Sequence, residues 1–280
     1  MNAGEPSRTA FAAARHRAAH QILEGGAIFA DPLAVTIAGG DREEIVREAQ
    51  ANPMSAFMRR FVCTRARFAE DILAAQVARG TDQCVVLGAG LDTFAYRSPY
   101  GEKLRAFEVD HPATGAWKAS KLREAGIDPP PWLQTVAVNF ETDDLTERLY
   151  ATGFDRHRAT MFIWLGVVPY LTRPAIFKTL SQIAAQPAEV AVVFDYANPP
   201  ELFSPQMRAL HDVRAAQVAA IGEPWITHFT AAELHAELLK LGFLSLEDLG
   251  PRQMAQRYYP QYVALAGEYG GHVICARKLT

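Results

Sequence analysis

CVVLGAGLDT, residues 84–93, is the stretch that decides the fold. An apolar run enters a Gly-x-Gly turn, which is typical of a buried parallel strand that ends in a sharp loop. Gly88 and Gly90 tolerate positive φ and carry no Cβ, so a ligand can approach the backbone of this loop closely. We therefore predict that Gly88 and Gly90 bind a cofactor.

A second apolar stretch, Leu104–Asp110, follows about 20 residues later and ends in acidic residues. A glycine-rich turn after one strand and an acid after the next is how an open α/β sheet holds a nucleotide-type ribose. Asp110 is the predicted acceptor for the ribose hydroxyls, and Glu108 is the competing candidate.

The residues inside the loop distinguish between two cofactors. A dinucleotide fold requires a third glycine where this chain has Thr93, and Asp92 is a poor neighbour for a pyrophosphate. S-adenosylmethionine carries a sulfonium and an ammonium group and no phosphate, so the loop favours it over NAD. The glycine pair alone is also compatible with a turn that binds no ligand.

Strands and helices alternate after residue 80, which predicts parallel βαβ units. We expect strands at 83–87, 104–109, 134–138, 160–165, 190–195, 243–247 and 272–277, and a helical insertion at 198–222. The predicted fold is α/β and Rossmann-like. Residues 1–80 form an N-terminal helical cap, and residues 81–280 form the core, with a lid insertion at about 198–230.

The segment LGAGLDTFAYR, residues 87–97, resembles the LGAGLDTRAYR signature of the leucine carboxyl methyltransferase-like family, with Phe94 as its main departure. Weaker matches occur at 9–10, 31–34, 65–71, 108–112, 166–171 and 194–196. The resemblance implies a class I S-adenosylmethionine-dependent O-methyltransferase of the bacterial small-molecule subgroup. It also implies a mostly parallel seven-stranded sheet with an antiparallel last strand.

The resemblance assigns several further residues to cofactor binding. Arg65 would hold the cofactor's carboxylate, because a guanidinium pairs with it through two hydrogen bonds. Arg67 is the alternative, and Thr9 is a weaker candidate for the same carboxylate.

Three positions near the expected adenine and sulfonium differ from the family or are ambiguous. Asn139 stands where the family has an acid that contacts the adenine amino group, and an amide oxygen can accept that bond. Phe140 could pack on the adenine or in the core. Leu165 replaces a glutamate of the family, which leaves an apolar wall beside the cofactor and puts a protein C-terminal leucine in doubt as the substrate.

Methyl transfer requires mainly correct positioning of the two reactants. A carboxylate acceptor needs no base, whereas a hydroxyl acceptor usually does. Tyr170, Tyr196 and His211 are the predicted catalytic residues. The further candidates, Asp195 and His228, leave the choice of base open.

Composition excludes several classes of protein. The net charge is −3 and the chain has no basic run, so we expect no nucleic-acid partner. No apolar stretch is long enough to span a membrane, and Met1–Pro6 lack the apolar core of a signal peptide. Cys63, Cys84 and Cys275 have no metal-ligand spacing, and only Cys63 is expected to be exposed. These features predict a cytoplasmic protein without a metal.

The sequence thus predicts an O-methyltransferase that acts on a carboxylate or hydroxyl of a small organic acceptor. One alternative is a protein C-terminal carboxyl methyltransferase. Another is a cofactor-binding protein without methyltransferase activity. The choice between a monomer and a homodimer stays open.

Overall fold

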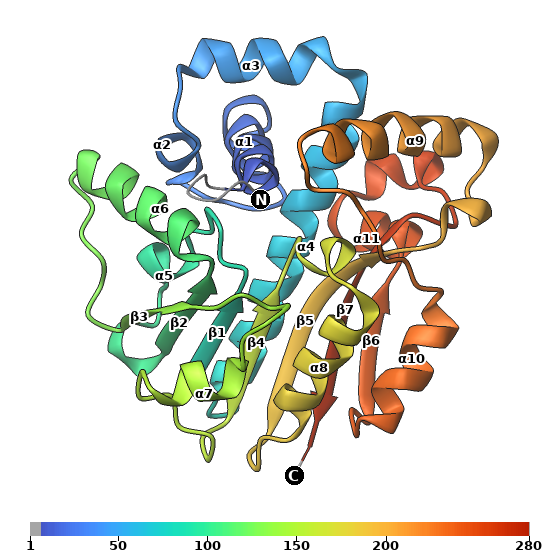
Figure 1. Cartoon of the computed structure of the whole chain (residues 1–280). Helices are drawn as coiled ribbons and strands as arrows, with labels where there is room; N and C mark the ends of the chain where they lie inside the picture. The colour runs from blue at the N-terminus through green and yellow to red at the C-terminus, as the bar shows by residue number, and fades with distance from the viewer. Residues whose placement is uncertain (1–6, 280) are drawn as a thin grey trace.

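The computed structural model describes residues 7–279, so the expectation for Met1–Pro6 lies outside the described residues. Seven strands form one sheet in the order β3-β2-β1-β4-β5-β7-β6 (Figure 1). The strands are β1 (Gln83–Leu87), β2 (Arg105–Asp110), β3 (Leu133–Ala137), β4 (Thr160–Trp164), β5 (Val190–Ala197), β6 (Ser245–Leu249) and β7 (Gly271–Lys278). β7 runs antiparallel to both neighbours, and the pairs among β1 to β5 are parallel. The predicted fold class is confirmed.

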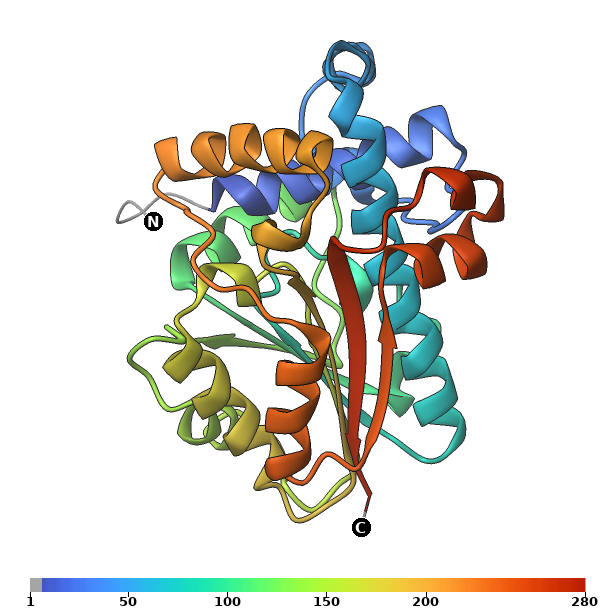
Figure 2. The ribbon, with the colours of Figure 1, turned by 90° about the vertical axis from the view of Figure 1, so that its right-hand side faces the viewer.

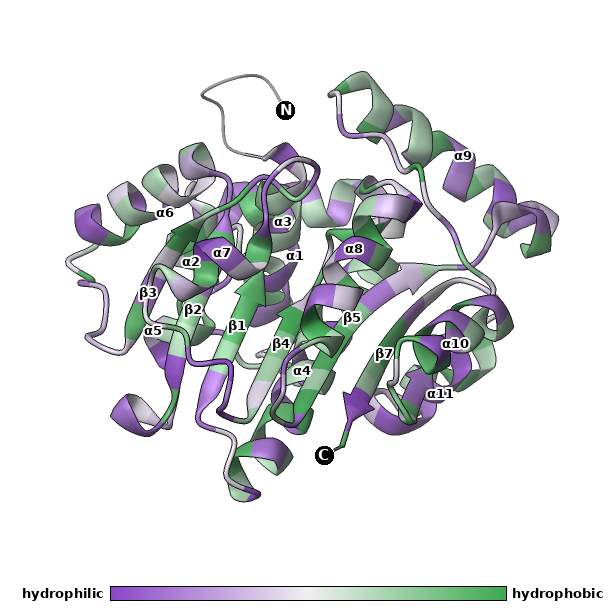
Figure 3. Cartoon of the chain, turned by 60° about the horizontal axis from the view of Figure 1, so that its bottom comes forward, coloured by the Kyte–Doolittle hydropathy of each residue, from purple (hydrophilic) through white to green (hydrophobic). Residues whose placement is uncertain are grey.

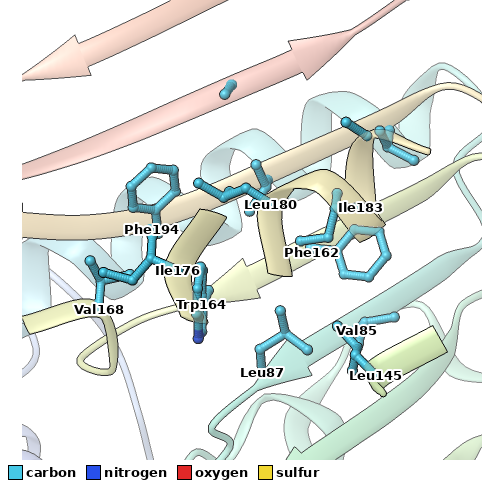
Figure 4. Packing of buried hydrophobic residues seen from close by; sticks show 14 of the residues in the cluster. Val85, Leu87, Leu145, Phe162, Trp164, Val168, Ile176, Leu180, Ile183 and Phe194 are labelled. Atoms are coloured by element: carbon cyan, nitrogen blue, oxygen red, sulfur yellow. The ribbon is translucent and has the colours of Figure 1, made fainter. Parts of the chain in front are cut away.

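Side chains that alternate along the strands build two cores, one on each face of the sheet. Val85 and Leu87 of β1 point into the first core, together with Trp164 of β4 (Figure 4). The helices α7 (Leu145–Tyr150), α8 (Arg173–Ala184) and α10 (Ala231–Lys240) cover this face, and Figure 4 shows Ile176 and Leu180 of α8 against the strands. Cys84 and Val86 point into the second core, under α4 (Pro53–Ala78) and α11 (Pro251–Tyr258).

The N-terminal helices lie above the carboxyl ends of the parallel strands (Figure 1). They are α1 (Arg8–Leu23), α2 (Ala34–Ala38), α3 (Arg42–Ala51) and the first turns of α4. Ala14 and Ala18 of α1 are fully buried against Ile37 of α2 and Leu91 of the glycine loop. Small side chains at these positions let the helix axis come close to its neighbours, so the cap packs directly on the loop after β1.

The insertion between β5 and α10 contains the helix α9 (Pro205–Ala220). Figure 2 shows α9 and α1 above the ends of the strands, and Figure 3 shows α9 standing apart from the hydrophobic strands of the sheet. Thr230 caps α10, since its hydroxyl accepts the backbone N–H of Glu233 at 3.3 Å. This segment therefore has the position over the strand ends that a lid requires.

Several details differ from the sequence-based expectations. The helix α11 was not predicted, and the short helix α5 (Phe94–Arg97) lies within the signature segment, ahead of α6 (Pro112–Glu124). Cys63 is buried like Cys84 and Cys275, because it lies on the face of α4 that packs against Ile28 and Phe29. Burial raises the pKa of the Cys63 thiol to about 12. Among the described residues, no helix is both long and apolar enough to cross a membrane.

Candidate cofactor and acceptor site

A cavity of about 680 Å³ lies at the carboxyl ends of β1, β2, β4 and β5, between the cap and α9. Every residue predicted for the site lines it: Thr9, Arg65, Gly88, Gly90, Asp110, Asn139, Phe140, Leu165, Tyr170, Tyr196 and His211. The competing candidates Glu108 and Arg67 are not part of the lining. The chain folds so that residues from both ends of the sequence meet here.

The glycine loop has a backbone that other residues would strain. Gly88 has φ +64° and Gly90 has φ +49°, both in the left-handed region. A Cβ on Gly88 would lie 2.3 Å from Cγ2 of Val167. The N–H groups of Gly88 and Ala89 both donate to the carbonyl oxygen of Val109, at 2.7 and 3.1 Å. The loop is thus tied to β2 and leaves its glycine surface open to the cavity.

Asp110 lies at the end of β2 beside this loop. Its Oδ2 accepts the N–H of Gly90, and its Oδ1 accepts the N–H of His111 at 2.6 Å. Burial raises the pKa of Asp110, while these two backbone hydrogen bonds favour the ionised form. A carboxylate has about four acceptor positions, so further hydroxyl groups can still be bound.

Glu108 lies two residues earlier in β2 and shares the face of Asp110. The two carboxylates lie on the same face of β2, but Glu108 is farther from the carboxyl end of the strand than Asp110. Glu108 is buried under α6 and forms an ion pair with Lys118, at 2.8 Å between Oε1 and Nζ. The geometry therefore leaves Asp110 as the candidate for the ribose.

The signature segment is mainly a support for the glycine loop. Arg17 donates to Asp31 at 2.9 Å and to the carbonyl oxygen of Leu91 at 2.6 Å. Thr93 donates to the other oxygen of Asp31 at 2.8 Å, and Arg97 donates to Thr93 at 2.9 Å. Arg17, Asp31 and Thr93 are buried, so this network holds the loop rigid from below.

Arg65 enters the cavity from α4. Its Nη1 donates to Oδ2 of Asp195 at 2.8 Å, and Oδ1 of Asp195 accepts the N–H of Gly166 at 2.5 Å. A guanidinium has five donors, so this pairing leaves others available for a ligand carboxylate. Arg67 lies on another face of α4, where it is exposed and pairs with Asp71 at 2.7 Å.

The adenine and sulfonium candidates follow β3 and β4. Asn139 is exposed, and its Oδ1 already accepts the N–H of Glu141 at 3.1 Å. Phe140 packs near Trp164, with 6.1 Å between ring centroids, and it also lines the cavity. Phe140 thus packs on the core and also faces the cavity, and its contact with the adenine stays a prediction. Leu165 lines the cavity and also packs against the second core.

The three candidate catalytic residues differ in what their polar atoms contact. Burial raises the pKa of Tyr170, and the neighbouring side chains of Trp225 and Thr9 offset part of this rise. The Tyr196 hydroxyl donates to Asp248 at 2.6 Å, and burial together with that carboxylate raises the pKa of Tyr196. Both tyrosines therefore stay protonated at neutral pH.

His211 lies on α9 among aromatic rings. Its ring centroid is 5.5 Å from those of both Phe203 and Trp225. The Nδ1 atom lies 3.2 Å from Oδ1 of Asp212, and Nε2 is buried without a hydrogen-bond partner among the described residues. An imidazole held by a carboxylate on one nitrogen can accept a proton on the other.

Sequence reasoning missed several polar residues of the lining, among them His16, Arg214 and Glu223. Burial, with the nearby charges of Arg214, Arg59 and Arg65, lowers the pKa of His16 to about 3. The Glu223 carboxylate accepts the N–H groups of Arg8 and Thr9 at 3.1 and 3.0 Å, which ties the lid to the start of α1. Of these residues, only Arg214 could have been found from the sequence. It belongs to a set of residues with the spacing of one helix face: Met207, Leu210, His211, Arg214 and Val218.

Comparison with known proteins places the chain in a family. The family model "Leucine carboxyl methyltransferase" matches residues 10–184, and the chain belongs to this family. The predicted resemblance is therefore confirmed, and S-adenosylmethionine is the cofactor of the family. Among the described residues, no group of three or more His, Cys, Asp or Glu side chains could hold a metal ion.

Two relatives carry the same type of name. "Putative S-adenosyl-L-methionine-dependent methyltransferase YktD" of Bacillus subtilis is 36% identical over 200 residues, which is 70% of this chain and 64% of the relative. A "Putative S-adenosyl-L-methionine-dependent methyltransferase" of Mycobacteroides abscessus is 32% identical over 189 residues, 65% of this chain and 62% of the relative. The chain thus matches slightly less than two thirds of the length of these relatives.

Two solved structures share the fold. The CurJ carbon methyltransferase has a TM-score of 0.53 at 16% identity, covering 97% of this chain and 67% of that chain. The S-adenosylmethionine-dependent methyltransferase SibL, in its apo form, has a TM-score of 0.50 at 14% identity, covering 94% and 70%. At such low identity the likeness shows the fold alone, and it does not distinguish transfer to oxygen from transfer to carbon.

Proposed function

We propose that this protein is an S-adenosylmethionine-dependent O-methyltransferase for a small organic acceptor. The observation that carries the proposal is that the glycine loop and the aromatic lid line one shared cavity. One wall offers bare backbone and a ribose-type carboxylate, and the other offers Phe203, Met207 and Trp225. A cavity of this size with mixed apolar and polar walls suits a cofactor and a small molecule together.

The residues present fit the cofactor. Gly88 and Gly90 leave room where a side chain would intrude, and Asp110 can accept ribose hydroxyls. Arg65 would hold the carboxylate of the amino-acid part, and Asp92 in the same lining would suit its ammonium group. When bound, the cofactor supplies an activated methyl group. The protein's part is to bind, to orient the acceptor and to exclude water.

The choice of oxygen as the acceptor atom rests on family membership and on the available base. A carboxylate acceptor needs no base, and His211 is placed to take the proton of a hydroxyl acceptor. Its Nε2 has no partner among the described residues, while Asp212 contacts the other ring nitrogen. Tyr170, which stays protonated, would donate a hydrogen bond to the acceptor. Tyr196 would hold the strand ends through Asp248 rather than act on the acceptor.

The alternative of a protein C-terminal substrate requires an open groove. In this structure the lid and cap close on each other through Glu223 and the start of α1. The rings of Phe203, His211 and Trp225 contact one another on the same side of the cavity. These contacts favour a small acceptor, and Leu165 in place of the family's glutamate agrees with a different substrate.

The test has two stages. Calorimetry with S-adenosylhomocysteine and, separately, with NAD should show binding of the first only. A panel of small aromatic acids and phenols is then incubated with S-adenosylmethionine carrying a labelled methyl group, and the products are tested for alkali-labile esters and stable ethers. Binding of NAD alone would refute the cofactor assignment. Cofactor binding without turnover of any acceptor would favour the reading of a binding protein without activity.

A further inference from the structure

The charged residues of the cavity lining are almost all paired. The five carboxylates of the described lining each accept at least one hydrogen bond: Asp92, Asp110, Glu141, Asp195 and Glu223. Of the three arginines in this lining, Arg17 pairs with Asp31 and Arg65 pairs with Asp195. Arg214 is the exception, because within residues 7–279 it forms no ion pair and no hydrogen bond.

Arg214 also lies where a ligand would meet it. It belongs to the stripe of α9 that faces the cavity, one turn after Leu210 and one turn before Val218. Partial burial lowers the pKa of Arg214 and Tyr170 offsets part of this, while the charge of Arg214 helps to lower the pKa of His16. A guanidinium stays charged even so, and a partly buried charge without a partner is unfavourable. A ligand anion would remove that cost.

We propose that Arg214 binds a carboxylate of the acceptor, so that the enzyme selects small aromatic or apolar molecules that carry a negative charge. This inference deepens the proposed function and rests on it. The guanidinium can hold a carboxylate through two parallel hydrogen bonds. His16, which is neutral, and Tyr170, which keeps its proton, line the same cavity and add hydrogen-bonding groups without adding a negative charge. The rings of Phe203 and Trp225 would contact the body of the acceptor.

The cofactor's own carboxylate is the other anion that could reach this cavity. Arg65 is assigned to it, since Arg65 comes from the helix α4 under the glycine loop and is held in place by Asp195. Arg214 comes from α9 on the opposite wall. The two arginines should therefore control different ligands, which gives the experiment its two readouts.

The experiment uses the full-length protein and the probe pair phenylacetate and phenylacetamide, which differ in charge but hardly in shape. Calorimetry measures the Kd of each probe with and without saturating S-adenosylhomocysteine, and the Kd of S-adenosylhomocysteine itself. The variants are Arg214→Gln, Arg214→Lys and, as a matched control, Arg208→Gln. Arg208 lies on the same helix outside the cavity lining and pairs with Asp212 at 3.1 Å.

In the wild-type protein we expect the Kd of phenylacetate to be lower than that of phenylacetamide by a factor of about ten or more. Arg214→Gln should abolish that preference, Arg214→Lys should keep part of it, and Arg208→Gln should keep all of it. The Kd of S-adenosylhomocysteine should stay the same in all three variants.

Three results would overturn the inference. Equal binding of the two probes by the wild-type protein would show that the cavity does not select an anion. An unchanged preference in Arg214→Gln would place the anion elsewhere. A weaker affinity for S-adenosylhomocysteine in Arg214→Gln would assign Arg214 to the cofactor. Failure of the wild-type protein to bind S-adenosylhomocysteine, with the phenylacetate preference intact, would instead refute the methyltransferase proposal and support the anion site.

Discussion

The glycine loop and the lid helix α9 form opposite walls of one cavity, and they are held in place by different means. The loop rests on buried hydrogen bonds from Arg17, Asp31 and Thr93, and on two backbone bonds to β2. The helix α9 contains no buried residue, and Leu210 and Val213 are exposed at 38% and 62%. The cofactor wall is therefore preformed, whereas α9 is held by contacts of residues that are not buried.

This difference implies a division of roles. A rigid wall can bind a cofactor without rearrangement, because its geometry is fixed before the ligand arrives. A lightly held lid can change its residues at little cost in stability, since few core contacts depend on them. Variants of the loop should therefore act on cofactor affinity, and variants of the lid should act on the acceptor.

The largest effect is expected from Gly88→Ala. The new Cβ would clash with Val167 and the residue would keep a strained positive φ, so affinity for S-adenosylhomocysteine should fall about a hundredfold. Gly80→Ala is the matched control, because Gly80 also has a positive φ, +104°, but an added Cβ would meet nothing within 4 Å. Calorimetry on both variants checks this. Unchanged affinity in Gly88→Ala would show that the loop does not hold the cofactor.

The next effect is expected from Arg65→Ala, which should weaken binding of S-adenosylhomocysteine about tenfold to a hundredfold, as expected for about 1.5–3 kcal/mol. Arg67→Ala on the same helix should leave the Kd unchanged. Arg65→Ala also removes the ion-pair partner of the buried Asp195. The double variant Arg65→Ala/Asp195→Ala is therefore needed to separate a loss of cofactor binding from a loss of folding stability. If Arg65→Ala and Arg67→Ala behave alike, the assignment of Arg65 is wrong.

Asp110→Asn should have a smaller effect, about a tenfold loss of affinity, because an amide oxygen accepts more weakly than a carboxylate. Burial raises the pKa of Asp110 above its ordinary value of 3.8. The ionised form binds the ribose, so affinity in the wild-type protein should decrease as pH falls through that raised pKa. In Asp110→Asn this pH dependence should disappear. Calorimetry across a pH series of both proteins tests it, and parallel curves would contradict it.

The smallest effect is expected from Glu223→Gln. The amide keeps one acceptor but places an NH₂ group against the donors at the start of α1, which should loosen the lid by about 1 kcal/mol. Hydrogen exchange should become faster in residues 205–222 and stay unchanged in β1 and β4, with no more than a minor change in cofactor affinity. Identical exchange in both proteins would mean that Glu223 does not hold the lid.

Much of the cofactor wall could be predicted from the sequence because its signals are local. The strand, the two glycines and the acid after the next strand lie within 84–110, and the structure places them as expected. Two assignments, Asp110 over Glu108 and Arg65 over Arg67, could not be made from the local sequence pattern. Glu108 and Asp110 share a face of β2, so only their depth separates them, and the position of Arg67 depends on how α4 is rotated against the sheet.

The sequence by itself determined the class of fold, the glycine loop and the family, because hydrophobic alternation and a signature segment act over short stretches of chain. Only the tertiary structure decided what meets across the cavity. Arg65 and Asp195 are 130 positions apart, and Ser7 and Glu223, which are also hydrogen-bonded, are 216 apart. No local pattern encodes such pairs, since they form only when the cap and the lid close over the same strand ends. The charge of Arg214, which has no ion-pair partner within residues 7–279, likewise became visible only in the folded chain.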